Sequence, residues 1–277
     1  MRDSKLIAYS GFTRCNWVIS DMSDVVFQTR GINPFYQEEE DIEIIVSEVC
    51  EKMSIENVDS IHFYGAGCFF PQKQEIVRKV LAHHIPGVNI EVESDLLAAA
   101  RASCGREPGI ACILGTGSNS CFYNGFLVEK NVSPLGYILG DEGSRVIIGK
   151  IFINNLLNNQ YSNRLYEDFM KYYYTSPQEI VESVYKKTFP DRYLAQFTEF
   201  IAKNINEPAM YDLIFNAFSN FITKNVMKYN YMDYPVHFTG SLAACFEDIL
   251  RDACLTNGIR PGEITRNPLK GLIEYHH

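Results

Sequence analysis

The sequence predicts an α/β protein with two domains, on three observations. At 277 residues, the chain is long enough for about two domains. Short apolar runs rich in β-branched residues alternate with segments whose apolar residues recur at helical spacing. A run of glycine, proline and charged residues, Cys104–Gly109, interrupts this pattern and is typical of a boundary. We therefore expect an N-terminal domain at residues 1–108 and a helix-rich C-terminal domain at residues 109–277.

The composition is that of a globular protein, with 46% hydrophobic and 21% charged residues. The net charge of -9 argues against nucleic acid or an anionic membrane as a partner. A signal peptide is not expected, and neither is a transmembrane segment. The eight cysteines are scattered without a Cys-x-x-Cys pair. They are expected to be reduced core residues of a cytoplasmic protein, and a structural zinc site is not expected.

In the first domain, strands are expected where short apolar runs are bounded by turns, and helices where apolar residues recur every three or four positions. The expected strands are Lys5–Tyr9, Cys15–Ser20, Val25–Arg30, Ser60–Tyr64 and Val88–Val92, and the expected helices are Glu38–Met53, Gln72–His84 and one that starts near Glu93. The first three strands follow one another through short turns, which predicts an antiparallel meander.

The second domain opens with a strand at Ile110–Leu114, followed at once by the turn Gly115-Thr116-Gly117-Ser118. Glycines let the backbone bend sharply, and the successive N–H groups of such a turn, with its hydroxyls, can hold phosphate oxygens. Asn124-Gly125 predicts a hairpin between strands at Ser120–Tyr123 and Phe126–Val132. Taken alone, the glycine turn would also suit a plain hairpin.

The run Gly140-Asp141-Glu142-Gly143-Ser144 is expected to open the next helix, where a helix N-terminus favours negative charge. Beyond Lys150 we expect helices at Ile151–Leu157, Leu165–Tyr173, Pro177–Lys187, Leu194–Lys203, Glu207–Tyr229 and Ala244–Leu255, a strand at Pro235–Phe238 and a short helix from Pro268. Aromatic residues gather on these helices. Such a stripe is typical of a core or a dimer contact, and we expect a homodimer.

The order of these motifs resembles a known family. Gly115-Thr116-Gly117-Ser118-Asn119, Pro134-Leu135-Gly136 and Gly140–Ser144, with Lys150 after them, look like the centre of a bacterial N-acetylglucosamine kinase. More broadly they resemble the BadF/BadG/BcrA-type ATPases of the actin, hexokinase and Hsp70 superfamily. The resemblance implies two ribonuclease-H-like (actin-like ATPase) domains with ATP and a sugar in the cleft between them. It also implies Mg²⁺-assisted transfer of the γ-phosphate of ATP to a sugar hydroxyl.

The resemblance assigns the nucleotide to three turns. Gly115, Thr116, Gly117 and Ser118 would hold phosphates together with Gly11, Thr13 and Arg14, where Arg14 stands in place of the family's Lys. Gly240 and Ser241 match the adenosine-binding turn. The alternative for that turn is a strand-to-helix connection in which Thr239 or Ser241 caps the helix, and this is compatible with nucleotide binding.

The resemblance also assigns the sugar site. Asn33, Asn119, Asp141 and Glu142 would bind the sugar together with Asp95, which matches the family's catalytic carboxylate. A carboxylate within hydrogen-bond reach of a sugar hydroxyl can take its proton as the phosphoryl bond forms. The alternatives are an ordinary Asn-Pro turn at Asn33 and a helix cap at Ser94 or Asp95.

One position departs from the family. Tyr9 stands where the family has the Asp that orients magnesium, and Phe12 stands where a small residue faces the phosphates. The metal site is either damaged, or another carboxylate compensates, so no metal ligand is assigned. The sequence thus predicts an ATP-dependent kinase that phosphorylates an amino-sugar hydroxyl. The alternatives are a weak or inactive pseudokinase that senses a nucleotide or amino sugar, and an ATPase that activates a partner enzyme.

Overall fold

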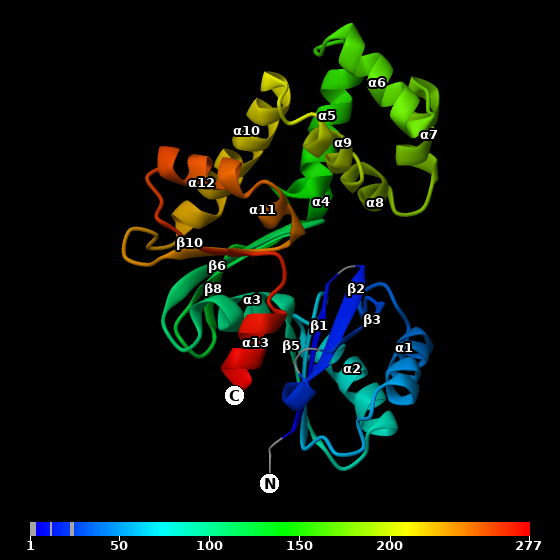
Figure 1. Cartoon of the computed structure of the whole chain (residues 1–277), viewed down its shortest axis with the longest axis vertical. Helices are drawn as coiled ribbons and strands as arrows, with labels where there is room; N and C mark the ends of the chain where they lie inside the picture. The colour runs from blue at the N-terminus through cyan, green and yellow to red at the C-terminus, as the bar shows by residue number, and fades with distance from the viewer. Residues whose placement is uncertain (1–3, 12, 23–24) are drawn as a thin grey trace. The chain divides into compact units, whose positions relative to one another are not determined.

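The computed structural model describes residues 4–11, 13–22 and 25–277. Phe12 lies outside the described residues. The chain forms two compact units, each built on a five-stranded sheet (Figure 1). The first unit runs to Pro108 and also takes in the hairpin tip Tyr123–Val128 and the terminal segment Asn267–His277. The domain bounds expected from the sequence, residues 1–108 and 109–277, stay a prediction.

The first sheet has the strand order β3-β2-β1-β4-β5. The predicted meander is present, because β1 pairs antiparallel with β2 and β2 with β3. The other pairs, β1 with β4 and β4 with β5, are parallel and therefore need crossover connections, which α1 and α2 supply. The bounds are β1 Lys5–Ser10, β2 Arg14–Ile19, β3 Val26–Arg30, α1 Glu39–Lys52, β4 Ser60–Gly65, α2 Pro71–His84, β5 Asn89–Ser94 and α3 Asp95–Cys104, with a short 3-10 turn at Ser20–Met22.

The terminal helix α13 (Leu269–His276) packs on α3 and β1 within the first unit. Gly271 makes this packing possible, because a Cβ there would stand 2.2 Å from the carbonyl oxygen of Ala102. Leu269 and Leu272 are buried there with Ile7 and Val18 of the sheet. The helix is thus an integral layer of this unit.

The second sheet has the order β10-β9-β6-β7-β8, with β9 parallel to both β6 and β10. The predicted hairpin is present, and its turn is closed by a hydrogen bond from the Asn124 N–H to the Leu127 carbonyl at 3.2 Å. The edge strand β10 was not predicted. The bounds are β6 Gly109–Leu114, β7 Ser118–Tyr123, β8 Val128–Asn131, β9 Val236–Thr239 and β10 Pro261–Thr265.

Helices make up the rest of the second unit. Two predicted helices are broken: Leu194–Lys203 is divided between α8 and α9, and Ala244–Leu255 between α11 and α12. The bounds are α4 Gly136–Leu139, α5 Arg145–Leu157, α6 Asn163–Tyr173, α7 Pro177–Lys186, α8 Pro190–Ala195, α9 Thr198–Lys203, α10 Pro208–Lys224, α11 Ser241–Cys245 and α12 Glu247–Thr256, with a 3-10 turn at Val226–Lys228.

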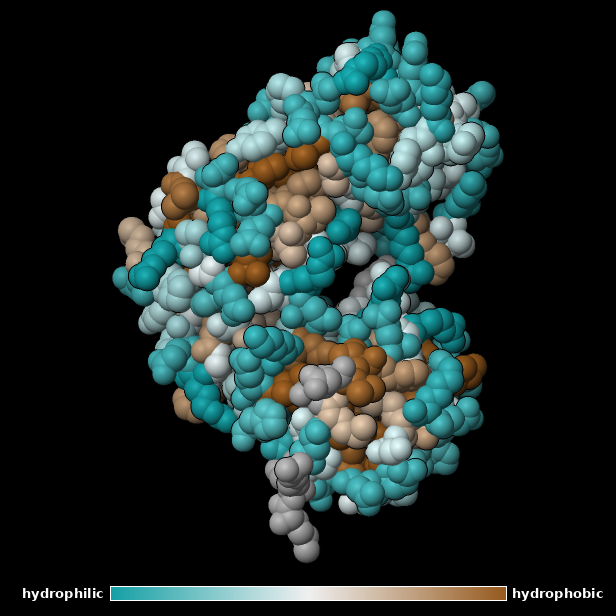
Figure 2. Space-filling view, in the orientation of Figure 1, coloured by the Kyte–Doolittle hydropathy of each residue, from teal (hydrophilic) through white to brown (hydrophobic). Residues whose placement is uncertain are grey.

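Many of the aromatic side chains of these helices lie inside the unit. Phe169 is fully buried and its ring contacts those of Phe152, Phe197 and Phe200 at centroid distances of 5.4, 5.3 and 5.2 Å. The surface over α6 and α7 is mainly teal and white in Figure 2, and the exposed residues of this segment include Tyr174 and Tyr185. The aromatic residues are thus part core and part surface, and the homodimer stays a prediction. No helix in the described part of the chain is long and apolar enough to cross a bilayer.

Candidate functional site

The predicted phosphate turn, Gly115–Ser118, links β6 to β7 and is fixed to the start of α5. Its own N–H at Gly115 donates to the Gly117 carbonyl at 3.0 Å, which closes the bend. The N–H groups of Arg145 and Val146 donate to the carbonyls of Gly115 and Thr116 at 3.0 and 3.3 Å. The first turn of α5 thus holds the loop in one conformation, which is the preorganised backbone that phosphate binding needs.

Asp141 lies directly beside this turn. A Cβ on Gly117 would stand 3.0 Å from Asp141 Oδ2, and the Ser118 hydroxyl donates to the Glu142 carbonyl at 2.8 Å. Asp141 has a φ of 58°, a left-handed conformation that Asp adopts more readily than most residues. The helix that follows begins later than predicted, at Arg145, and Ser144 caps it by accepting from the Ile147 N–H at 3.3 Å. The acidic pair therefore stands in the turn that precedes the helix.

A hollow of about 170 Å³ opens beside these residues in the second unit. It brings together four predicted site residues, Ser118, Asn119, Asp141 and Glu142. The complete lining is Ser118, Asn119, Val132–Leu135, Leu139–Glu142, Lys224 and Asn225. Asn119 is held by Asn131, whose amide donates to the Asn119 Oδ1 at 2.9 Å. The polar floor and partly apolar walls suit a small polar ligand such as a sugar.

The two carboxylates of this hollow differ in charge environment. Burial, and then the charge of Glu142, raise the pKa of Asp141 to about 6. Burial also acts to raise the pKa of Glu142, but the ammonium group of Lys224, 2.7 Å away, outweighs it and the pKa falls below its usual value. Glu142 is thus an ion-paired carboxylate, while Asp141 has no cationic partner among the described residues and is suited to accept hydrogen bonds from hydroxyls.

The predicted adenosine turn joins β9 to α11. Gly240 has a φ of 138°, and a Cβ there would stand 2.1 Å from the carbonyl oxygen of Leu114, so only glycine fits. Its N–H donates to the Thr265 carbonyl at 2.8 Å. Neither Thr239 nor Ser241 caps the helix through its side chain. Because Leu114 directly precedes Gly115, this turn and the phosphate turn are neighbours.

In the first unit, Asp95 is the first residue of α3. The helix cap is Ser94, whose Oγ accepts from the Leu97 N–H at 3.2 Å, so the capping role does not account for Asp95. The carboxyl of Asp95 loses hydration because protein atoms surround it, and this burial raises its pKa to about 6. A carboxyl with this pKa is ionised at neutral pH yet basic enough to take a proton.

Tyr9 lies in β1 opposite Asn16 and Tyr64. Burial, and then the charge of Asp95, raise the pKa of its hydroxyl well above the usual range. Tyr9 is therefore a neutral phenol that cannot replace a metal-binding carboxylate. In the adjoining turn, the Gly11 N–H donates to the Arg14 carbonyl at 3.0 Å, and the Gly31 N–H donates to the Thr13 carbonyl at 3.0 Å. The Thr13 and Arg14 side chains are exposed.

Asn33 is buried, and its Oδ1 accepts from the Phe35 N–H at 3.0 Å. Its own N–H donates to the Gln37 Oε1 at 2.6 Å, and its carbonyl accepts from the Tyr36 N–H at 3.1 Å. These contacts are those of an Asx turn, which is the alternative considered for this position. The side-chain oxygen of Asn33 is occupied in the structure.

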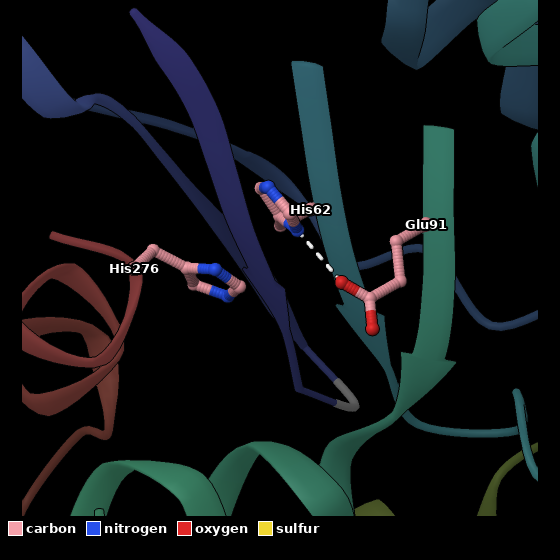
Figure 3. Close-up of side chains that lie close together, drawn as sticks. All are labelled: His62, Glu91 and His276. Carbon is pink, nitrogen blue, oxygen red and sulfur yellow. Dashed lines mark hydrogen bonds and ion pairs between the residues drawn. The ribbon is translucent and has the colours of Figure 1, made fainter. Parts of the chain in front are cut away.

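His62, Glu91 and His276 form a cluster that was not predicted from the sequence (Figure 3). The His62 Nδ1 lies 2.7 Å from Glu91 Oε2, and Arg101 Nη1 donates to Glu91 Oε1 at 2.8 Å. Both Glu91 oxygens are therefore engaged, and any cation here would have to compete with a guanidinium. His62 on β4 lies directly beside Glu91 on β5 in the register of the two paired strands. Their contact could therefore be predicted only after the pairing of β4 with β5 is known.

His276 reaches this cluster from α13. The Arg101 Nη1 also donates to the Tyr64 hydroxyl at 2.6 Å, and this hydroxyl is hydrogen-bonded to the His276 Nε2 at 2.8 Å. Burial, and then the charge of His62, lower the pKa of His276 to about 3. Its ring also packs on that of His62 at a centroid distance of 3.9 Å. The cluster is a hydrogen-bonded clamp that holds the terminal helix to the first sheet.

No protein-family model matches the chain, and no curated protein matches it. Several solved structures are similar to the chain. A candidate N-acetylglucosamine kinase from Porphyromonas gingivalis is 42% identical, with a TM-score of 0.91 over 98% of each chain. A second candidate N-acetylglucosamine kinase, from Chromobacterium violaceum, is 16% identical, with a TM-score of 0.76 over 99% of each chain. A ROK-family glucokinase from Streptomyces griseus, solved with glucose and AMPPNP, has a TM-score of 0.55 at 12% identity and covers 98% of this chain and 97% of its own.

These matches and the paired sheets define a sugar kinase of the two-domain actin/hexokinase class, as the sequence motifs predicted. The chain belongs to the BadF/BadG-type family of sugar kinases, and within it is similar to the N-acetylglucosamine kinases.

Proposed function

We propose that this protein is an ATP-dependent kinase of an amino sugar of the N-acetylglucosamine type, and that its turnover is slow. The observation that carries the proposal is the position of Asp141 beside the Gly115–Ser118 turn, in a polar hollow with Asn119. An unpaired carboxylate that accepts hydrogen bonds from sugar hydroxyls lies next to a backbone turn suited to phosphate. The similarity to the Porphyromonas gingivalis protein supports this choice of substrate class.

Each group has a defined part in the reaction. The N–H groups and hydroxyls of the Gly115–Ser118 turn hold nucleotide phosphates, and the resemblance noted in the sequence assigns Gly11, Thr13 and Arg14 to phosphates as well. Gly240 and Ser241 flank the adenosine. The carboxylate of Asp95 takes the proton of the sugar hydroxyl as that oxygen attacks the γ-phosphorus and the bond to ADP breaks. Mg²⁺, if it were held there, would supply positive charge to the nucleotide phosphates.

The residues present fit magnesium poorly. Tyr9 is neutral, and the Glu142 carboxylate is paired with Lys224 at 2.7 Å. Positioning and charge stabilisation supply most of the rate in phosphoryl transfer, so the loss of one metal-orienting carboxylate slows the reaction. This observation also favours a second function, an inactive relative that binds a nucleotide or amino sugar as a sensor.

The test is ADP release by the purified protein with ATP, Mg²⁺ and a panel of sugars that contains N-acetylglucosamine, N-acetylmannosamine, glucosamine and glucose. We expect ADP release that depends on an N-acetylated sugar and is lost in Asp95→Asn. Sugar binding by calorimetry without ADP release would establish the sensor. Equal turnover of glucose and N-acetylglucosamine would overturn the assignment to amino sugars.

A further inference from the structure

Arg145 connects the two proposed nucleotide-binding turns of the second unit. Its backbone N–H donates to the carbonyl of Gly115 in the phosphate turn at 3.0 Å. Its guanidinium extends to the adenosine turn, where Nη2 donates to the Ser241 Oγ at 3.3 Å. The residue is the first of α5, so both its backbone and its side chain are fixed in place.

The guanidinium carries an uncompensated charge. It is half-buried, and its other side-chain partner is the neutral hydroxyl of Thr198, 2.7 Å from Nη1. Among the residues that the structure describes, no Asp or Glu pairs with it. The titratable groups that act on it are the thiol of Cys245 and then Arg266, which is a second positive charge. A half-buried guanidinium without a counter-ion is costly, because two neutral hydrogen bonds replace only part of its hydration.

Two other cations of the second unit do have carboxylate partners. Arg251, on α12, bonds Glu247 through Nη2 at 2.8 Å, and Lys224 bonds Glu142 at 2.7 Å. These cations lie on the surface with carboxylate partners, as the balanced charges of a globular protein usually do. Arg145 instead lies between two backbone turns, where an anionic ligand would supply the missing charge.

We propose that Arg145 is a nucleotide-phosphate ligand whose guanidinium pairs with phosphate oxygens of the bound nucleotide on the side nearer the ribose. This rests on the proposed use of ATP. A guanidinium presents N–H donors in a planar fork that matches phosphate oxygens, and such charge-assisted bonds are strong. Arg145 would therefore discriminate between ADP, which carries phosphates, and adenosine, which does not.

The experiment compares the affinities of Mg-ADP, adenosine and pyrophosphate for the full chain by calorimetry. Arg145→Met keeps the length of the side chain and removes the charge. We expect this variant to lose roughly 10- to 100-fold in affinity for ADP and to change little in affinity for adenosine. Arg145→Lys keeps the charge but lacks the planar fork of donors. Its affinity for ADP should lie between those of the unaltered protein and Arg145→Met. The matched control is Arg251→Met, which removes the cation of the surface ion pair with Glu247 elsewhere in the unit. This variant should bind ADP as the unaltered protein does.

The outcomes separate this role from the proposed function. If the unaltered protein binds ADP and Arg145→Met binds it equally well, the phosphate role is wrong while ATP use stands. Equal losses for ADP and adenosine would also overturn it, because Arg145 would then only shape the adenosine turn. If the unaltered protein binds none of the three probes, the proposed use of ATP fails, and this role fails with it. Should Arg145→Met not fold, Arg145→Lys decides, since a phosphate ligand predicts a selective loss for ADP and pyrophosphate.

Discussion

The Asp141 carboxylate occupies the space that a side chain on Gly117 would need, since a Cβ there would stand 3.0 Å from Asp141 Oδ2. The contact joins the phosphate turn to the proposed sugar hollow within the second unit. The lack of a side chain at Gly117 therefore leaves room for the Asp141 carboxylate. This is a second reason for glycine at this position, in addition to the bend of the turn.

Gly117→Ala should displace Asp141 and weaken amino-sugar binding about tenfold, the effect of losing part of one charge-assisted hydrogen bond. Calorimetry with N-acetylglucosamine in the absence of nucleotide measures it. Gly115→Ala is the matched control, because the nearest heavy atom to a Cβ there is 4.0 Å away. Equal sugar affinities in both variants would show that Asp141 does not depend on Gly117, or does not bind the sugar.

Asp141→Asn should raise the melting temperature at pH 8 by roughly 2–4 °C, because it removes a partly buried charge and leaves a neutral amide of the same size. The folded pKa of Asp141 is about 6, above the unfolded value of about 3.9. Folding therefore carries the full cost of the ionised group above pH 6, and the cost disappears as pH falls from 6 towards 4. The advantage of the variant in thermal melts should shrink over that range. An advantage that persists at pH 4 would contradict the assignment.

His276 gives stability the opposite dependence on pH. Its folded pKa of about 3 lies below the unfolded value of about 6.5, so the unfolded chain binds a proton first as pH falls. The neutral ring therefore stabilises the fold fully above pH 6.5, and that stabilisation is lost between pH 6.5 and 3. Besides His62, the charged groups that act on this ring are Glu91, Arg101 and Lys5. Urea unfolding at pH 7 and pH 5 should show a loss of about 1 kcal/mol, after allowance for solvent screening.

His276→Asn should remove most of that difference between the two pH values, and His83→Asn, an exposed histidine on α2, should not. If the two variants lose stability equally between pH 7 and pH 5, the clamp on the terminal helix is not the source of the effect. Glu91 does not add to the difference between pH 7 and pH 5. Hydrogen bonds from His62 and Arg101 lower its pKa to about 2, so its stabilisation is complete above the unfolded value of about 4.3 and is lost only as pH falls from there towards 2.

The local features of this fold could be predicted from the sequence, and the non-local ones could not. The Asn124-Gly125 hairpin, the meander and the helices α1 and α2 follow from turn residues and periodicity. The edge strand β10 contains Pro261 and Gly262, which count against a strand. Gly262 is explained only by packing, because a Cβ there would stand 2.7 Å from the His237 ring.

The site shows the same division. The glycine turns and Asp141 are found by local motifs, whereas the clamp depends on contacts such as Tyr64 with His276, 212 positions apart. Arg145 has no motif of its own. Its uncompensated charge becomes visible only when the residues around its side chain are known.

Asp95 should act as the general base, so kcat/KM should rise with pH through about 6 and then level, because only the ionised carboxylate accepts a proton. Asp95→Asn should lower kcat by roughly 10²- to 10⁴-fold and leave nucleotide affinity unchanged. Steady-state kinetics from about pH 5 to about pH 8 measure the profile. A flat profile with retained activity in Asp95→Asn would assign the proton transfer to another group.

Tyr9→Asp should raise kcat by ~10²- to 10³-fold, the usual effect of one preorganised electrostatic contact, with little change in nucleotide affinity. The charge of Asp95 already acts on position 9, so a second carboxylate there would raise the pKa of Asp95 unless a cation lies with them. The gain should therefore require Mg²⁺ and should be absent in Tyr9→Asn, which is of similar size and neutral. Coupled ADP-release assays over a magnesium titration test both statements. If the kcat of the unaltered protein is already on the order of 1–100 s⁻¹, Tyr9 does not impair the metal site.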